Sequence, residues 1–268
     1  MRVKNNMNDL REYRKKLGFT NQTTLRKFFD SKDIVREIDF NYICSLNKRL
    51  IEIIKSVDNA VVETIKPDDL DKFIDENITQ VYEYMLSNGL LHKFSNNKQR
   101  QTERSYYDWS RGRIIANYFK KAMCLIFSVN ENDIKTIGLD NLDNPQSFTK
   151  APTADFEIKT SKNITYRIEF QCGFQGINDI KEHKVNEAQR VYNEYKINSL
   201  IIHVDLFNGK VAFVDISNID GKNINWEYRE QFEGKRVFNI GDNYFIWNLS
   251  DIPPKLNDIL NILKNINN

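Results

Sequence analysis

The stretch that decides the fold is Ala154–Gln171, ADFEIKTSKNITYRIEFQ. Its apolar side chains, at positions 156, 158, 166, 168 and 170, alternate with polar ones. A period of two is typical of strands that bury one face. Ser161-Lys162-Asn163, between the two alternating runs, is polar and typical of a turn. The sequence therefore predicts a β-hairpin.

A three-residue turn would pair Asp155 with Glu169 and Glu157 with Arg167. Facing side chains in such pairs have their Cβ atoms about 5 Å apart. Two carboxylates that close raise each other's pKa unless a cation neutralises them. A hard divalent ion bound through oxygens would do so, and Gln171 would point into the same space. The alternative is an ordinary half-exposed strand, on which Glu157 and Arg167 form a surface ion pair worth under about 1 kcal/mol.

The segments around the hairpin predict a mixed sheet with helices. Upstream, Thr102 to Phe127 has the pattern of one long helix. Downstream, Ile177 to Lys196 predicts a second helix, and Leu200–Phe207 and Val211–Ile216 predict two strands joined through Asn208-Gly209, a strong hairpin signal. Helix, hairpin, helix and strand thus follow one another.

In this order of elements, residues 100 to 216 resemble the PD-(D/E)XK nuclease superfamily, and within it the type II restriction endonucleases. Asp155 matches the first aspartate of the motif, and Glu169 matches the acidic residue of its triplet. Gln171 stands where the family usually has lysine, and the proline is displaced to Pro152. The resemblance implies an α/β (α+β) fold, a restriction-endonuclease-like mixed central sheet flanked by helices, with a helical N-terminal region.

The resemblance also implies a reaction, Mg²⁺-dependent hydrolysis of phosphodiester bonds in double-stranded DNA. Asp155 and Glu169 would hold the metal. Gln171 cannot carry charge, but it can hold the attacking water by hydrogen bonding. Lys181 or Lys184, on the helix that follows, is the candidate for the missing positive charge. The alternative for both lysines is an exposed, solvated helix face.

The helix before the hairpin carries further candidates. In the resembled family this helix often brings another acidic group to the metal, and here Glu103 or Asp108 is in position to do so. Residues 92–121 hold eight basic residues against these two acids, a local charge of +6, whereas the whole chain has 39 Lys+Arg against 37 Asp+Glu. A stripe of this kind fits an enzyme with a separate phosphate-binding surface better than a protein that coats DNA. The candidate DNA-binding residues are Arg104, Arg111 and Arg113.

Aromatic residues are interleaved with these arginines. Tyr106, Tyr107 and Trp109 are of the types that contact sugars or bases. Packing in the core is the alternative role, and the one that the sequence favours.

The amino-terminal third predicts a helical hairpin. Asn8 to Leu17 and Asn21 to Phe29 have helical patterns, separated by a glycine. The arrangement is compatible with a helix-turn-helix, in which Asn21, Gln22 and Arg26 are of the types that contact bases and phosphates. Dimerisation is the alternative role for this region.

Further helices are predicted at Phe40 to Val57, Leu70 to Leu86 and Leu256 to Ile266. A polar stretch follows the second of these. We therefore expect a helical N-terminal region over residues 1–90 and a nuclease-like domain over residues 91–268.

Several classes of function are disfavoured. Apolar runs of about 18 residues and a signal peptide are absent from the sequence, so a soluble cytoplasmic protein without membrane contact is expected. The phosphate-binding glycine motif is absent as well, which disfavours a nucleotide cofactor. Cys44, Cys124 and Cys172 are predicted to be buried free thiols, and His203 a strand residue.

The sequence therefore predicts a type II restriction endonuclease that acts as a homodimer, because two symmetric subunits match the two strands of a palindromic site. One alternative is a repair or recombination nuclease of the same fold. The other is a non-catalytic DNA-binding regulator that acts through the helix-turn-helix.

Overall fold

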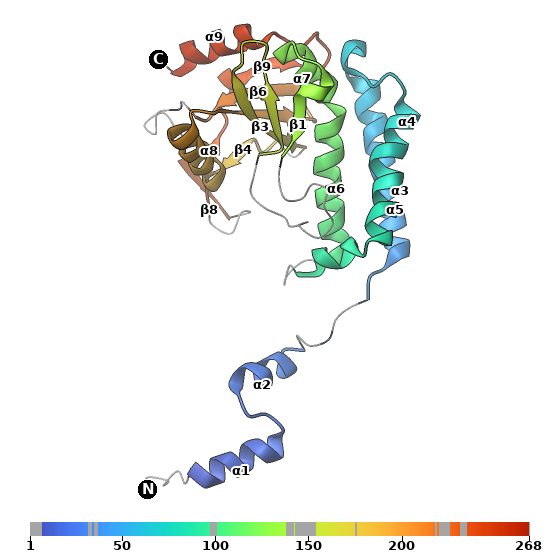
Figure 1. The fold of residues 1–268 in the computed structure, drawn as a ribbon, viewed down its shortest axis with the longest axis vertical. Coiled ribbons are helices and arrows are strands. Elements are labelled where there is room, and N and C mark those ends of the chain that lie inside the picture. Colours follow the sequence, from blue (N-terminus) through green and yellow to red (C-terminus); the bar gives the residue numbers. More distant parts are fainter. Residues whose placement is uncertain are drawn as a thin grey trace. The chain divides into compact units, whose positions relative to one another are not determined.

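The computed structural model describes residues 7–31, 34, 37–96, 101–137, 142, 154–174, 176–217, 219, 226–230 and 235–267 (Figure 1). The chain divides into two units, one up to Asp39 and one from Phe40 onward. The division lies after Asp39 and not near residue 90, where the helices on both sides pack together in the second unit.

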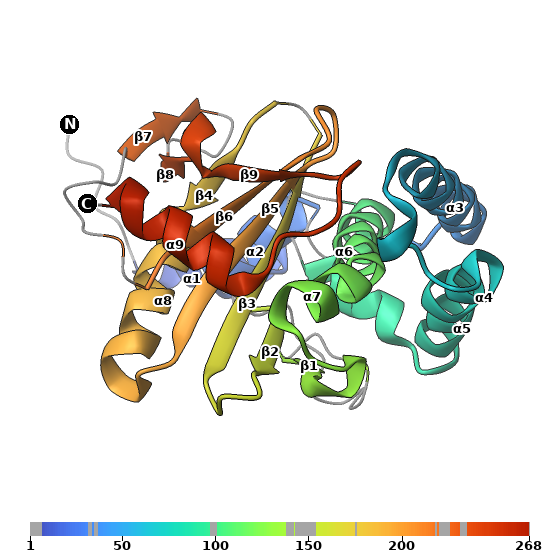
Figure 2. The ribbon, with the colours of Figure 1, turned by 90° about the horizontal axis from the view of Figure 1, so that it is seen from above.

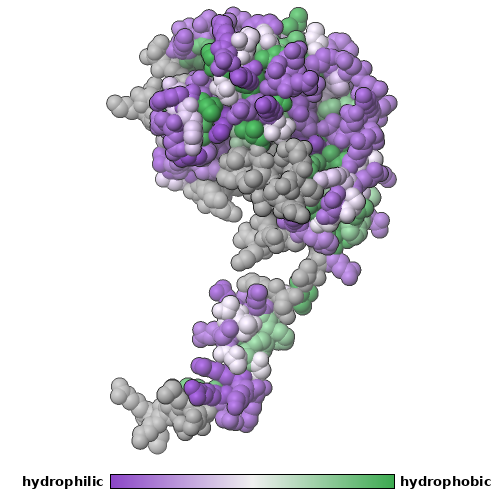
Figure 3. Space-filling model, viewed as in Figure 1, coloured by the Kyte–Doolittle hydropathy of each residue, from purple (hydrophilic) through white to green (hydrophobic). Residues whose placement is uncertain are grey.

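The first unit contains the two predicted helices, α1 (Met7–Leu17) and α2 (Gln22–Phe29). Gly18, at φ +82°, ends α1 in the left-handed conformation that glycine adopts without strain. The Asn21 side chain caps α2 by accepting a hydrogen bond from the Thr24 amide (2.9 Å). None of the α2 residues is buried, and Figure 3 shows hydrophobic residues on the surface there.

The second unit begins with a layer of helices. Tyr118 donates a hydrogen bond to Asp58 Oδ1 (2.7 Å), and Tyr106 donates one to Asn47 Oδ1 (2.9 Å). These bonds tie α6 to α3, and Figure 1 shows the two helices side by side. The predicted helix at 70–86 is confirmed with a π-helical turn inside it. The elements of this layer are α3 (Phe40–Ala60), α4 (Leu70–Ile74), the π turn Asp75–Thr79, α5 (Gln80–Ser87) and α6 (Thr102–Tyr118), with 3₁₀ turns at Glu63–Ile65 and Leu90–Asn96.

The long helix predicted over 102–127 is broken at Phe119. Here α6 ends and α7 (Lys120–Phe127) begins, because Phe119 has ψ near 6°. The Phe119 ring is 1% exposed and stacks on Phe170 of the central sheet at 5.6 Å. The break lets α7 turn so that Phe127 contacts Tyr166 farther along the same strand (5.7 Å).

The core of the second unit is a six-stranded mixed sheet of order β1-β2-β3-β5-β6-β9. Strands β3 and β5 are parallel, and the other neighbours are antiparallel. Helix α8 packs against β5, and α9 lies along the sheet near β6 (Figure 2). The strands are β1 (Ile134–Thr136), β2 (Phe156–Lys159), β3 (Thr165–Gly173), β5 (Asn198–Asp205), β6 (Lys210–Asp215) and β9 (Phe245–Asn248), and the helices are α8 (Glu182–Tyr195) and α9 (Leu256–Asn267).

A second sheet of three strands has the order β4-β8-β7. Its first strand, β4 (Asp179–Lys181), occupies part of the segment predicted as helix from Ile177, which is therefore wrong over its first five residues. Ile180 is completely buried by pairing with Phe238 on β8, which a helical pattern in the sequence does not reveal. The other strands are β7 (Trp226–Arg229) and β8 (Lys235–Asn239), and 3₁₀ turns lie at Glu131–Asp133 and Asp242–Tyr244.

The β2–β3 hairpin has the predicted register, with Glu157 opposite Arg167. The Thr160 amide donates to the Ile164 carbonyl (2.9 Å), which closes a three-residue turn. Asn163 sits in this turn at φ 64°. The predicted fold class is confirmed: a mixed central sheet is flanked by helices, with a helical region before it.

Two other expectations have definite outcomes. All three cysteines are free thiols, but Cys44 is exposed and the other two are only partly buried. Cys44 follows the buried Ile43 and therefore lies off the buried face of α3. Among the described residues, no helix has the length and apolar composition needed to span a membrane.

Candidate functional site in a cleft beside the hairpin

A cleft of about 960 Å³ lies where the β2–β3 hairpin meets α6 and α8. One wall is α6, from Asp108 to Asn117. The other walls are formed by the end of β1, by the adjoining residues of β2 and β3, and by Lys181 and Lys184 at the start of α8. The sequence-predicted residues Asp155, Glu169 and Gln171 all line this cleft.

Asp155 lies one residue before β2 and is fixed on both sides by backbone hydrogen bonds. Its amide donates to the Ile168 carbonyl (3.0 Å), and its carbonyl accepts from Ile137 (3.0 Å). Its carboxylate Oδ2 accepts a hydrogen bond from the Phe170 amide (2.8 Å). The ladder stops at Phe156, so Asp155 and Glu169 are not the ladder pair that the sequence predicted. The hydrogen bond to Phe170 nevertheless holds the Asp155 carboxylate beside Glu169.

Glu169 is almost buried, with 7% of its surface exposed. Its Oε1 forms an ion pair with Lys184 Nζ. Lys184 lies in the first turn of α8, which packs on this face of the sheet. Of the two lysines proposed to replace the motif lysine, Lys184 is therefore the one in contact with the acidic residue of the triplet.

Gln171 lies beside His203, its partner on the parallel strand β5, and both line the cleft. The His203 Nε2 is 2.8 Å from the Asn178 Oδ1. Burial lowers the pKa of His203 to about 4, so its imidazole is neutral at physiological pH. His203 is the strand residue that the sequence predicted.

Cys172 also lines the cleft. Burial raises the pKa of its thiol to about 12, so this cysteine is protonated at neutral pH. A thiolate nucleophile is therefore disfavoured.

Basic side chains slightly outnumber acidic ones around the cleft. Burial lowers the pKa of Lys120, whose ammonium lies 5.5 Å from the Phe156 ring centre. Asp179 is committed to an ion pair with Arg229 (2.9 Å) and is 1% exposed at its side chain. The basic lining residues are Arg113, Lys120, Lys135, Lys181 and Lys184, and the acidic ones are Asp108, Asp155, Glu169 and Asp179.

Lys120 and Lys135 line this cleft although the sequence did not predict them there. Lys120 enters it because the helix breaks at Phe119. Lys135 enters it because β1 pairs with β2, opposite Glu157. Neither the break nor the short strand has a clear local signal in the sequence.

The two acidic candidates of the preceding helix, Glu103 and Asp108, differ in their position relative to the cleft. Glu103 is 1% exposed and is not among the described residues that line the cleft. Asp108 does line it, and it forms an ion pair with Arg111 (3.2 Å).

The candidate DNA-binding arginines separate into two groups. Arg113 lines the cleft. Arg104 and Arg111 both lie over the ring of Tyr107, at 5.2 and 5.3 Å. Tyr107 is 7% exposed, and Tyr106 (1%) and Trp109 (7%) are buried as well, which confirms the packing role for these three aromatic residues.

The candidates in the first unit have partners of their own. The Asn21 Oδ1 accepts the capping hydrogen bond of α2 from the Thr24 amide (2.9 Å). Arg26 pairs with Asp30 (3.5 Å), and Gln22 is exposed at the start of α2.

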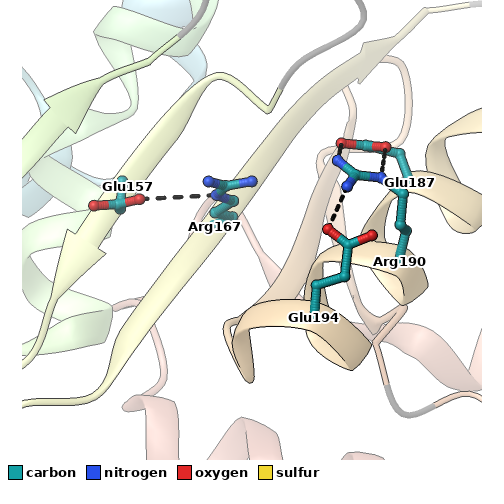
Figure 4. A network of polar contacts seen from close by, with 5 residues as sticks. All are labelled: Glu157, Arg167, Glu187, Arg190 and Glu194. Carbon is teal, nitrogen blue, oxygen red and sulfur yellow. Dashed lines mark hydrogen bonds and ion pairs between the residues drawn. The ribbon is translucent and has the colours of Figure 1, made fainter.

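Two charged pairs or networks lie outside the cleft, one on the hairpin and one on α8. Glu157 and Arg167 form an ion pair at 3.8 Å, as Figure 4 shows. On α8, Arg190 binds both Glu187 (2.8 Å) and Glu194 (2.6 Å). The predicted pairing of Glu157 with Arg167 is therefore confirmed.

The cleft residues fit a hard cation such as Mg²⁺. Among the described residues, no group of three or more His, Cys, Asp or Glu side chains is arranged to hold a metal. Mg²⁺, however, is commonly bound by one or two carboxylates and takes its remaining ligands from water and phosphate. Asp155 and Glu169, held at neighbouring backbone positions, provide such a pair of oxygen donors.

Fold and site together define a mixed α/β protein with an acidic pair and a lysine in one cleft. No protein-family model matches the sequence, and no curated protein matches it. Among solved structures, the chain is similar to Hjc, a Holliday junction resolvase of the archaeal hyperthermophile Archaeoglobus fulgidus, with 7% identity and a TM-score of 0.32. The match covers 54% of this chain and 98% of that chain. At this TM-score the likeness carries no argument, so the proposals below rest on the residues of this chain.

Proposed function

We propose that the protein is a metal-dependent nuclease that hydrolyses phosphodiester bonds in DNA within the cleft. The observation that carries the proposal is the placement of Asp155, Glu169 and Lys184 together in one cleft. Carboxylate pairs recruit divalent cations, and cations stabilise the negative charge of a reacting phosphate. The surrounding basic side chains supply contacts for phosphates on either side.

Each residue has a distinct part in this proposal. Asp155 and Glu169 would hold a Mg²⁺ ion, which when bound stabilises the charge that develops on the phosphate. Lys184 pairs with Glu169 and brings a positive charge to the place where the phosphate would bind. Gln171 orients a water through its amide and takes no proton at neutral pH. Lys120 and Arg113 bind the backbone next to the cleaved bond.

The finer proposal is a type II restriction endonuclease that cuts double-stranded DNA as a homodimer in the cytoplasm. A pair of identical subunits supplies one cleft for each strand of a palindromic site. The alternative of the same chemistry is a repair or recombination nuclease. The cleavage products distinguish the two enzymes, because only a restriction endonuclease cuts at one sequence and gives discrete fragments.

A non-catalytic DNA-binding regulator is the rival from another class. One observation favours it: Glu169 already has a cationic partner in Lys184, and Gln171 replaces the charged residue of the motif. Such a protein would bind DNA and leave it intact.

The test is incubation of long unmethylated duplex DNA with purified protein and Mg²⁺, with a chelator as control. The variants Asp155→Asn and Glu169→Gln should abolish cleavage. Glu157→Gln is the matched control, because it removes a carboxylate from the same hairpin outside the cleft.

Discrete bands that disappear with the chelator and both cleft variants support restriction. A smear that disappears in the same controls supports a repair nuclease. Intact DNA with several metals and substrates contradicts the nuclease proposal and favours the regulator.

A further inference from the structure

A cation–aromatic stack stands at the rim of the cleft. The Arg111 guanidinium lies over the Tyr107 ring at 5.3 Å and over the Phe174 ring at 5.0 Å. Arg104 covers Tyr107 as well, at 5.2 Å. A guanidinium within about 6 Å of a ring centre is attracted by the negative face of the ring. The stack therefore joins α6 to the residue that follows β3.

The Arg111 side chain is committed to this stack. Asp108 binds it at 3.2 Å, and 25% of the Arg111 side chain is exposed. With its charge paired and its plane covered by Tyr107 and Phe174, Arg111 is a poor phosphate ligand. Its geometry instead fixes the position of Phe174.

Phe174, by contrast, has 48% of its surface exposed. It lies between Gly173, which lines the cleft, and Gly176, whose φ is +68°. An aromatic side chain held in water by a paired arginine, next to a cleft, is available for stacking. Exposed aromatic rings beside basic grooves are the means by which proteins bind unpaired bases.

We propose that Phe174 stacks on an unpaired base of the substrate, so that the cleft prefers DNA with a gap, a flap or a flipped nucleotide over a continuous duplex. This inference rests on the proposed nuclease function and specifies its substrate, and a preference for unpaired bases favours the repair or recombination nuclease over the restriction endonuclease. The bases of a continuous duplex stack on each other and cannot offer a face to Phe174, whereas a base in a gap can. Stacking on one aromatic ring changes affinity for a single-stranded base roughly tenfold.

The experiment compares two DNA probes in a chelator, so that binding is measured apart from cleavage. One is a continuous duplex. The other has the same sequence with a short gap in one strand, and the intact strand carries 2-aminopurine opposite the gap. The proteins are the wild type, Phe174→Ala, Phe174→Tyr and Phe207→Ala. Phe207 is the matched control, since it is an exposed phenylalanine (80%) in the β5–β6 turn and does not line the cleft.

The proposal expects the wild type to bind the gapped probe more tightly and to quench its fluorescence. Phe174→Ala should lose roughly tenfold in affinity for the gapped probe and none for the duplex. Phe174→Tyr, which keeps the ring, and Phe207→Ala should behave as the wild type does.

Equal affinity of the wild type for both probes overturns the inference. So does a Phe174→Ala variant that loses the same affinity for both probes, or that loses no affinity for either. A wild type that binds neither probe also overturns it. Cleavage of the same probes in Mg²⁺ reports separately on the proposed function. Cleavage without a preference for gaps refutes only the stacking site, and a Phe174-dependent preference without cleavage refutes only the nuclease.

Discussion

Replacing Lys184 by methionine removes the cationic partner of Glu169 and keeps most of the side-chain volume. Only 9% of the Glu169 side chain is exposed, so the remaining carboxylate would be almost buried without its counter-ion. Breaking a fully buried pair costs about 3–5 kcal/mol. The open cleft lets water reach Glu169 in part, so we expect the free energy of unfolding to fall by about 2 kcal/mol.

Chemical and thermal denaturation measure this loss. A change of about 2 kcal/mol should lower the Tm by about 4–8 °C for a domain of this size. Glu169→Gln should cost less than about 1 kcal/mol, because the Lys184 side chain that it leaves is 24% exposed and its flexible stem can reach water. The double variant Glu169→Gln/Lys184→Met should be more stable than Lys184→Met alone.

Arg190→Met is the control for removing a cation from the same helix. Arg190 is half exposed and pairs with two exposed glutamates, so its loss should cost under about 1 kcal/mol. If Lys184→Met unfolds no more easily than Arg190→Met, the buried ion pair does not stabilise the fold as expected. A double variant that is no more stable than Lys184→Met would show the same.

Three further predictions follow from the burial and contacts of single groups. The pKa of His203 is about 4 in the folded protein and lies below the ordinary value of 6.5, so the unfolded chain binds the proton first as the pH falls. The free energy of unfolding should therefore decrease by up to about 3 kcal/mol as the pH drops from about 6.5 toward 4. In urea denaturation, a His203→Gln variant whose stability depends on pH as steeply as that of the wild type would show that His203 is not the cause. Tyr118→Phe removes a 2.7 Å hydrogen bond to Asp58 and should cost about 1–2 kcal/mol, and an unchanged urea midpoint would show that the bond contributes nothing. Mg²⁺ should raise the Tm of the wild type through binding to the folded state but not that of Asp155→Asn or Glu169→Gln, and an equal rise in all three would place the ion elsewhere.

The parts of the fold that could be predicted from sequence are those with a strong local period. The β2–β3 register follows from alternation on both sides of a short polar turn, and it placed Glu157 opposite Arg167 correctly. Asp155, Glu169 and Gln171 reached one cleft for the same reason.

The parts that could not be predicted depend on contacts distant in sequence. At the break, Phe119 stacks on Phe170, which lies 51 residues later in the sequence. Ile180 belongs to a strand only because β8 pairs with it. Helical periodicity describes both segments equally well, since the burial of an apolar side chain does not by itself reveal its neighbours.

The choice between Lys181 and Lys184 also needed the structure. Both lie near the start of α8 and both line the cleft. Lys184 is the one whose ammonium meets the Glu169 carboxylate, because α8 begins at Glu182 rather than at Ile177. The placement of the helix start thus decides which of the two lysines contacts Glu169.

The most direct test of the proposed nuclease site is the single-turnover rate of DNA cleavage in Mg²⁺ by Glu169→Gln, measured beside Glu157→Gln. The two variants make the same chemical change on one hairpin, and only Glu169 lines the cleft. We expect the cleavage rate to fall by at least about a hundredfold in Glu169→Gln and to stay near that of the wild type in Glu157→Gln. Equal rates for the two variants, or a wild type that cleaves no DNA, would contradict this expectation.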